Sequence, residues 1–113
     1  MATINVYEQY FVAEGTFSDV PRRGALVMLI ADSCDGSIRY DAAVTFFPHR
    51  DEEDYAVSYD ACFEKTIYEA KGRRSRKKEQ AFLEKFQDVI DEIAAEHDAK
   101  VFWDNPLREA RRG

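Results

Sequence analysis

Residues 76–97 read Arg-Lys-Lys-Glu-Gln-Ala-Phe-Leu-Glu-Lys-Phe-Gln-Asp-Val-Ile-Asp-Glu-Ile-Ala-Ala-Glu-His and carry a helical pattern. Apolar side chains and one histidine recur at the α-helical period: Phe82, Leu83, Phe86, Val89, Ile90, Ile93, Ala94 and His97. The other side of the predicted helix carries Glu84, Lys85, Asp88, Asp91, Glu92 and Glu96. Ser75 is the predicted N-cap, because its hydroxyl can accept a backbone N–H of the first turn. A helix with one apolar face needs a second layer to cover that face.

Strand patterns fill the sequence before this helix. Four stretches are rich in β-branched and aromatic residues or alternate in polarity: Thr3–Ala13, Gly24–Ala31, Ile38–Phe47 and Tyr55–Tyr68. Asp35-Gly36, between the second and third stretches, is a strong hairpin signal. We predict loops at 14–21, anchored by Phe17, and at 48–54. The second to fourth stretches then form an antiparallel meander with one face in water.

A last short apolar stretch, Ala99–Trp103, follows the helix, and Asn105-Pro106 ends it. The order β-β-β-β-α-β predicts an α+β fold. Its antiparallel β-sheet, a meander of four to five strands, has one long amphipathic helix packed on one face. Residues 1–113 are expected to form a single domain, because the length fits one. Residues 107–113 are expected to be a frayed, charged tail.

Composition points to a folded protein without a membrane partner. The hydrophobic content of 45% excludes global disorder. The longest apolar run, Ala25–Ala31, is far shorter than the roughly 18 residues that span a bilayer. The first residues lack the pattern of a signal peptide, so a cytoplasmic location is expected. Cys34 and Cys62 are expected to be reduced thiols, with a bridge between them as the alternative if a hairpin brings them together.

One segment is strongly basic in a chain whose net charge is −6. Residues 71–78 hold six of its 16 lysines and arginines. The candidate partner-binding cations there are Arg73, Arg74, Arg76, Lys77 and Lys78. They could contact several phosphates of a nucleic acid, although no aromatic residue is interleaved for base stacking. The alternatives are a solvated connector, ion pairing within the chain, and contact with a protein or ligand.

Acidic residues form the second candidate surface. They lie in a loop after the third strand and on the predicted outward face of the third and fourth strands: Asp41, Asp51, Glu52, Glu53, Asp54, Asp60 and Glu64. Together with the acidic helix side, they could steer a basic partner toward the protein. The alternatives are ordinary solubilising charge and a metal site in the loop. Because the loop lacks calcium-loop spacing, no metal is expected.

No residue pattern indicates catalysis. His97 is expected to cap the helix or pack at the core edge, and His49 has no nucleophile near it in sequence. The chain lacks a phosphate-cradling glycine loop, Cys/His metal spacing and the Gly-x-Ser-x-Gly motif. We therefore expect neither an enzyme nor a cofactor. The aromatic residues Tyr7, Phe47 and Trp103 have ambiguous phases and belong either to the core or to an anchor patch.

These patterns favour a small acidic, non-catalytic protein-binding module. By analogy of size and charge alone, it could be an inhibitor of the phage or mobile-element type, directed against a defence complex. Its partner would present the basic surface of a nucleic-acid-handling protein. One alternative is nucleic-acid or phosphate binding through residues 71–78. Another is a small ligand-binding domain or enzyme that uses a pocket between sheet and helix, with His49 or a cysteine. A homodimer through an edge strand or the open sheet face fits all three.

Overall fold

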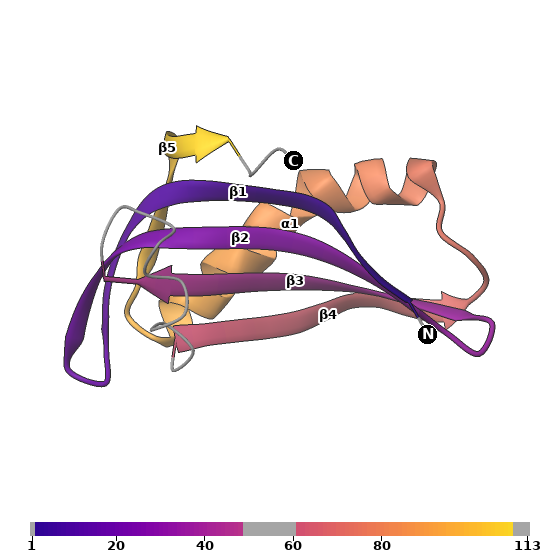
Figure 1. The fold of residues 1–113 in the computed structure, drawn as a ribbon, viewed down its shortest axis with the longest axis horizontal. Helices are drawn as coiled ribbons and strands as arrows, with labels where there is room; N and C mark the ends of the chain where they lie inside the picture. Colours follow the sequence, from indigo (N-terminus) through magenta and orange to yellow (C-terminus); the bar gives the residue numbers. More distant parts are fainter. Residues whose placement is uncertain (1, 49–60, 110–113) are drawn as a thin grey trace.

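The computed structural model describes residues 2–48 and 61–109 and shows one antiparallel sheet crossed by one helix (Figure 1). The elements, in chain order, are β1 (Ala2–Phe17), β2 (Val20–Cys34), β3 (Ser37–Phe47), β4 (Cys62–Lys71), α1 (Arg76–Glu96) and β5 (Lys100–Glu109). The strand order is β4-β3-β2-β1-β5, so β5 returns to pair with β1. This confirms the predicted α+β class and the order β-β-β-β-α-β.

The hairpin between β1 and β2 differs from the prediction. Residues 14–21 are not a loop: β1 continues to Phe17, β2 starts at Val20, and only Ser18 and Asp19 lie between them. Both turn residues have left-handed φ values, 52° and 63°, as a tight two-residue hairpin requires. Phe17 stacks on Phe46 at a centroid distance of 5.0 Å. We attribute the longer strands to this packing, which extends the hairpin through a polar stretch.

This turn gives the first prediction. Asn-Gly fits left-handed turn positions better than Ser-Asp, so Ser18→Asn combined with Asp19→Gly should stabilise the protein by about 1 kcal/mol. Thermal unfolding followed by circular dichroism should show a midpoint higher by about 5 °C. Ser18→Asn alone is the control and should give the smaller share of the gain. A lower midpoint for the double variant would mean that the Ser18 and Asp19 side chains make stabilising contacts.

The main core lies between α1 and the sheet. The helix buries Phe86, Ile90, Ile93 and Ala94 against side chains of the strands, as the apolar stripe predicts. Its ends also match the sequence. Ser75 is the N-cap and accepts the Lys78 N–H at 3.3 Å.

The helix C-terminus is closed by aromatic stacking and by backbone hydrogen bonding. His97 is the C-cap, and its backbone N–H is directed at the last-turn carbonyl groups. Its ring stacks on Phe63 at 4.1 Å. Tyr7 and Trp103 both pack edge-on against Phe86, which places these two ambiguous aromatic residues in the core.

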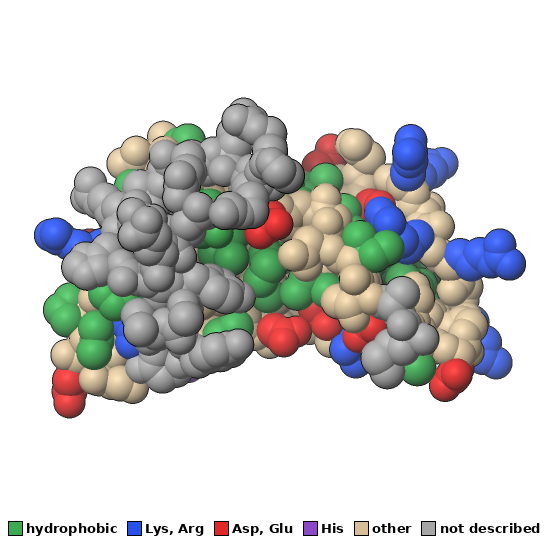
Figure 2. Space-filling view, viewed as in Figure 1, with side chains coloured by type: hydrophobic (Ala, Val, Ile, Leu, Met, Phe, Trp, Pro, Cys, Tyr) green, Lys and Arg blue, Asp and Glu red, His purple; other side chains and the backbone are tan. Residues whose placement is uncertain are grey.

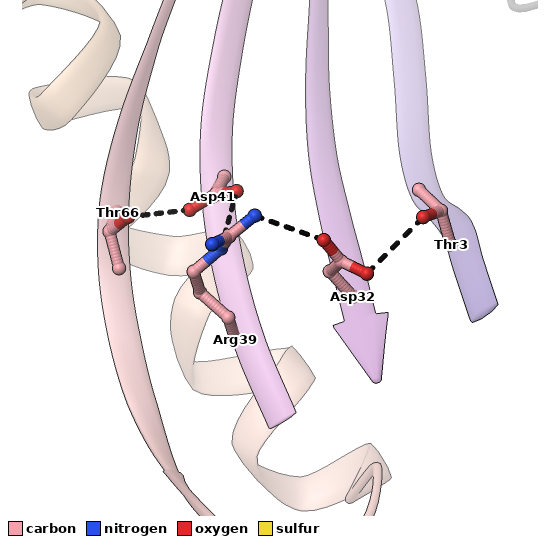
Figure 3. A network of polar contacts seen from close by, with 5 residues as sticks. All are labelled: Thr3, Asp32, Arg39, Asp41 and Thr66. Atoms are coloured by element: carbon pink, nitrogen blue, oxygen red, sulfur yellow. Dashed lines mark hydrogen bonds and ion pairs between the residues drawn. The ribbon is translucent and has the colours of Figure 1, made fainter. Parts of the chain in front are cut away.

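The sheet face opposite α1 is divided into two halves. A second apolar cluster occupies the half nearer the β1–β2 turn and contains Tyr10, Leu26, Met28, Ala43 and Phe47. Hydrophobic side chains are visible at the middle of this face in Figure 2. The prediction of a wholly wet face is therefore wrong here, because β2 and β3 alternate between two apolar sets of side chains. The other half carries a polar network (Figure 3).

Candidate functional site

The basic segment is tied to the sheet by a buried carboxylate. Glu79, in the first turn of α1, is 5% exposed and accepts hydrogen bonds from three donors. Arg74 donates twice, at 2.8 and 3.0 Å, and the Tyr40 hydroxyl donates at 2.8 Å. The Tyr40 oxygen in turn accepts the Ser75 backbone N–H at 3.3 Å. We call Tyr40, Arg74, Ser75 and Glu79 the clasp. It joins β3 to the start of α1.

The clasp keeps its charges at neutral pH. The Arg74 guanidinium holds the pKa of Glu79 below its usual value, against the opposing effect of burial. The hydrogen bond to Glu79 raises the pKa of Arg74. Burial, followed by the hydrogen bond to Glu79, raises the pKa of Tyr40. A protonated tyrosine and an ion pair are the state in which the Tyr40 hydroxyl and the Arg74 guanidinium can both donate to the Glu79 carboxylate.

The six cations of the basic segment fall into two groups. Arg74 belongs to the clasp, and the Lys78 ammonium lies 2.8 Å from the Tyr68 hydroxyl and 4.8 Å from the centre of that ring. The other four are exposed and form no ion pair with a residue that the structure describes: Lys71, Arg73, Arg76 and Lys77. We call these four the basic end. Internal ion pairing, one of the alternatives for this segment, thus holds for Arg74.

Asp41 does not lie on an exposed acidic surface, so that part of the prediction is wrong. It is 4% exposed and accepts hydrogen bonds from Thr66 at 2.8 Å and from Arg39 at 3.2 Å. Arg39 also donates to Asp32 at 2.9 Å, and Thr3 donates to Asp32 at 3.3 Å. This row crosses four strands (Figure 3). Strand alternation correctly gave the face of Asp41 but not its partners, which hold its carboxylate within the sheet.

The other acidic candidates are placed only in part. Glu64 is exposed on β4 and lies opposite Ala43, on the same sheet face as Asp41. Lys65 beside it faces the helix layer and reaches Glu92 at 3.3 Å. Asp51, Glu52, Glu53, Asp54 and Asp60 lie outside the described residues, as does His49.

The acidic side of the helix, which the sequence indicated as part of the acidic surface, contains one regular row of carboxylates. Four exposed carboxylates on α1 follow one another at intervals of four residues: Glu84, Asp88, Glu92 and Glu96. We call them the acidic ridge, because residues four apart are neighbours on a helix surface, with about 5–6 Å between their Cβ atoms. Asp91 is outside this row and accepts the Trp103 indole N–H at 2.8 Å. The four-residue spacing was the signal in the sequence that could have revealed the ridge.

The charges of α1 run against the helix dipole. The basic end adjoins its N-terminus, where anions are favoured, and its last turn contains no basic residue. Like charges four residues apart also destabilise a helix, by about 0.2–0.5 kcal/mol for each pair. Helix stability therefore does not account for this pattern.

Two hollows bear on the enzyme and ligand-binding alternative. One, of about 790 Å³, lies where β1 and β2 meet the helix C-terminus, and is lined by residues that include Arg23, His97 and Asp98. Another, of about 310 Å³, is lined by Cys34, Arg73 and other residues.

The two cysteines, Cys34 and Cys62, are exposed free thiols. They lie at opposite ends of the sheet, because Cys34 pairs with Ser37 and Cys62 with Thr45, so the Cys34–Cys62 bridge is excluded.

Comparison with known proteins gives no relative. No family model, curated protein or solved structure matches the chain. Among the residues that the structure describes, no helix is long and apolar enough to cross a membrane. The function must therefore be argued from the surfaces themselves.

Proposed function

We propose that the protein is a small acidic, non-catalytic binding module whose acidic ridge engages a basic surface of a partner protein. The observation that supports this is the row of four exposed carboxylates at four-residue spacing on α1. The row is present although Glu96, in the last turn, opposes the helix dipole and although like charges four residues apart oppose each other. A pattern that lowers helix stability at several positions is typical of a surface kept for another purpose.

The ridge suits a partner that carries a row of lysines or arginines. Its four members span twelve residues, or about 18 Å along the helix axis. Proteins that bind nucleic acid present such cations for phosphate groups. Complementary charge of this kind accelerates association and weakens as salt rises. We therefore propose that the partner handles nucleic acid and that the module, occupying its phosphate-binding surface, acts as an inhibitor.

The free thiols agree with action in the cytoplasm. Cys34 and Cys62 are both exposed and form no disulfide, a state that a reducing compartment preserves.

The predicted acidic residue Glu64 does not belong to the proposed binding surface. It projects from the face of β4 opposite to Lys65, and Lys65 faces the helix layer that carries the ridge.

Charge reversal of the ridge tests the proposal. Asp88→Lys combined with Glu96→Lys should reduce capture of the partner at least about tenfold, because both changes place cations against cations. The same variant should gain a few tenths of a kcal/mol in stability, since it removes like-charge pairs and adds a cation to the last helical turn. The measurement is quantitative affinity capture from nuclease-treated lysate of the source or host cells, paired with urea unfolding.

A variant with the same change in net charge controls for nonspecific effects. Glu14→Lys combined with Asp104→Lys alters two exposed acids that are not members of the ridge and should leave capture largely unchanged. Equal capture by the wild type and the ridge variant, with no dependence on salt, would refute the proposed function.

A further inference from the structure

The basic end presents four exposed cations that the rest of the described chain leaves without ion pairs. Acids outnumber bases in the sequence, 22 to 16, so carboxylates are plentiful. Arg39, Lys65 and Arg74 all have carboxylate partners. Lys71, Arg73, Arg76 and Lys77 have none among the described residues, and several Lys and Arg side chains project from one end of the molecule in Figure 2.

The backbone that carries these cations is held at both sides. The Gly72 N–H donates to the Gly36 carbonyl in the β2–β3 turn at 2.8 Å. Gly72 itself has a φ of 132°, which favours glycine. Two residues later the clasp fixes Arg74 and Ser75 to β3. The backbone that carries the four cations is therefore ordered before a ligand arrives, which reduces the backbone entropy lost on binding.

The position of these four cations lowers the stability of α1 itself. Lys71 and Arg73 lie just before the N-terminus of α1, and Arg76 and Lys77 lie in its first turn. Cations there oppose the helix dipole, and the one acid of that turn, Glu79, is buried in the clasp. The dipole and the four cations add their potentials on one side of the molecule. A bound polyanion would offset both the repulsion among the four cations and their unfavourable interaction with the helix dipole.

We propose that the basic end binds the phosphate backbone of double-stranded nucleic acid without reading its sequence. Two arginines and two lysines can each contact a phosphate oxygen. Tyr68, the aromatic residue beside them, has its hydroxyl and ring engaged by Lys78, so a stacking platform of the kind used by single-strand binders is missing from this described end. The apolar face of α1 is packed on the sheet, which leaves the helix no apolar surface for a bilayer.

The test is fluorescence anisotropy of a labelled DNA duplex of about 20 base pairs, titrated with the full chain at several salt concentrations. We expect weak binding at low salt. The plot of log affinity against log salt should be no steeper than about −3.6, which corresponds to four phosphate contacts. Replacing Arg73, Arg76 and Lys77 with Gln should weaken binding at least about tenfold and bring the slope to about −0.9. None of the three makes a hydrogen bond in the clasp, so the fold should survive.

A second triple variant separates position from net charge. Replacing Lys65, Lys85 and Lys100 with Gln removes the same charge from exposed sites elsewhere and should have a much smaller effect. Equal weakening by both triple variants would overturn the proposal. So would failure to bind any duplex at low salt, tighter binding to a single strand of equal length, or binding to anionic lipid vesicles in place of DNA.

This inference stands apart from the proposed function. The ridge variant Asp88→Lys with Glu96→Lys keeps the basic end intact and should bind the duplex at least as tightly as the wild type. Protein capture and duplex binding are therefore measured separately on the same variants. A result that contradicts one of the two proposals leaves the other to be judged by its own assay.

Discussion

Glu79→Gln should lower the free energy of unfolding by about 2 kcal/mol at neutral pH, although it changes a single charge. The substitution preserves the size of the side chain but turns an acceptor for Arg74 and Tyr40 into a neutral amide. Breaking a fully buried ion pair costs about 3–5 kcal/mol. Because the Arg74 side chain is 41% exposed and can return to water, we expect the loss to fall below that range.

The difference between wild type and Glu79→Gln should depend on pH in a defined direction. Folding lowers the pKa of Glu79, so the unfolded chain binds a proton more readily than the folded protein does. The stabilisation is therefore complete above the unfolded value of about 4.3, and it is lost as the pH falls through the lower folded value. Urea unfolding at a series of pH values should show the two midpoints converging in acid.

A neighbouring carboxylate provides the control for this effect. Glu84→Gln changes an exposed acid on the same helix and should alter stability by less than about 0.5 kcal/mol. A Glu79→Gln protein as stable as the wild type at neutral pH would show that the clasp does not contribute to folding. A gap that widened in acid would contradict the lowered pKa.

Phe86→Ala should have the largest effect on stability, a loss of about 3–5 kcal/mol. Phe86 is 2% exposed and lies where α1 meets the sheet, with Tyr7 at 5.3 Å and Trp103 at 6.0 Å between ring centres. Truncation removes both edge contacts and leaves a cavity between the layers. For a domain whose total stability is about 5–15 kcal/mol, this is a large fraction.

The single tryptophan makes this prediction simple to measure. Trp103 packs against Phe86 and Phe11, so its fluorescence should report the docking of helix and β5 during urea unfolding. Phe86→Leu retains most of the apolar volume and should cost clearly less than Phe86→Ala. A loss below about 1 kcal/mol for Phe86→Ala would mean that α1 is not packed on the sheet as described.

The sequence predicted the elements with the clearest periodicity. The apolar stripe of α1, the Ser75 cap and the Asp35-Gly36 turn follow local rules, and the structure confirms each of them. The turn at Ser18 and Asp19 was predicted as part of a longer loop, because neither residue is a glycine and because long-range packing of Phe17 extends the strands. Local preference was overridden there by tertiary contact.

The candidate sites were harder to predict because polarity does not reveal pairing. Asp41 and Arg74 read as surface charges, but Asp41 is bound by Thr66, which is distant in sequence. Arg74 is bound by Glu79, five residues away, and Glu79 is in turn bound by Tyr40 on the distant strand β3. Strand alternation predicts the sheet face on which a side chain lies, and a run of cations predicts the net charge of a segment. Neither gives the register that brings side chains together. The acidic ridge, by contrast, follows from spacing alone, and the acidic side of the helix was part of the predicted surface.

The pairing of β5 with β1 has a consequence for how the protein is made. Strands β1 to β4 can pair with their sequence neighbours as they leave the ribosome, but Val12 can meet Phe102 only after β2, β3, β4 and α1 have been translated. Contacts of such long range form slowly. Until then the free edge of β1, with Phe11 and Val12, stays open to pairing with other nascent chains. Pairing of β5 with β1 therefore covers a strand edge at which nascent chains could otherwise associate.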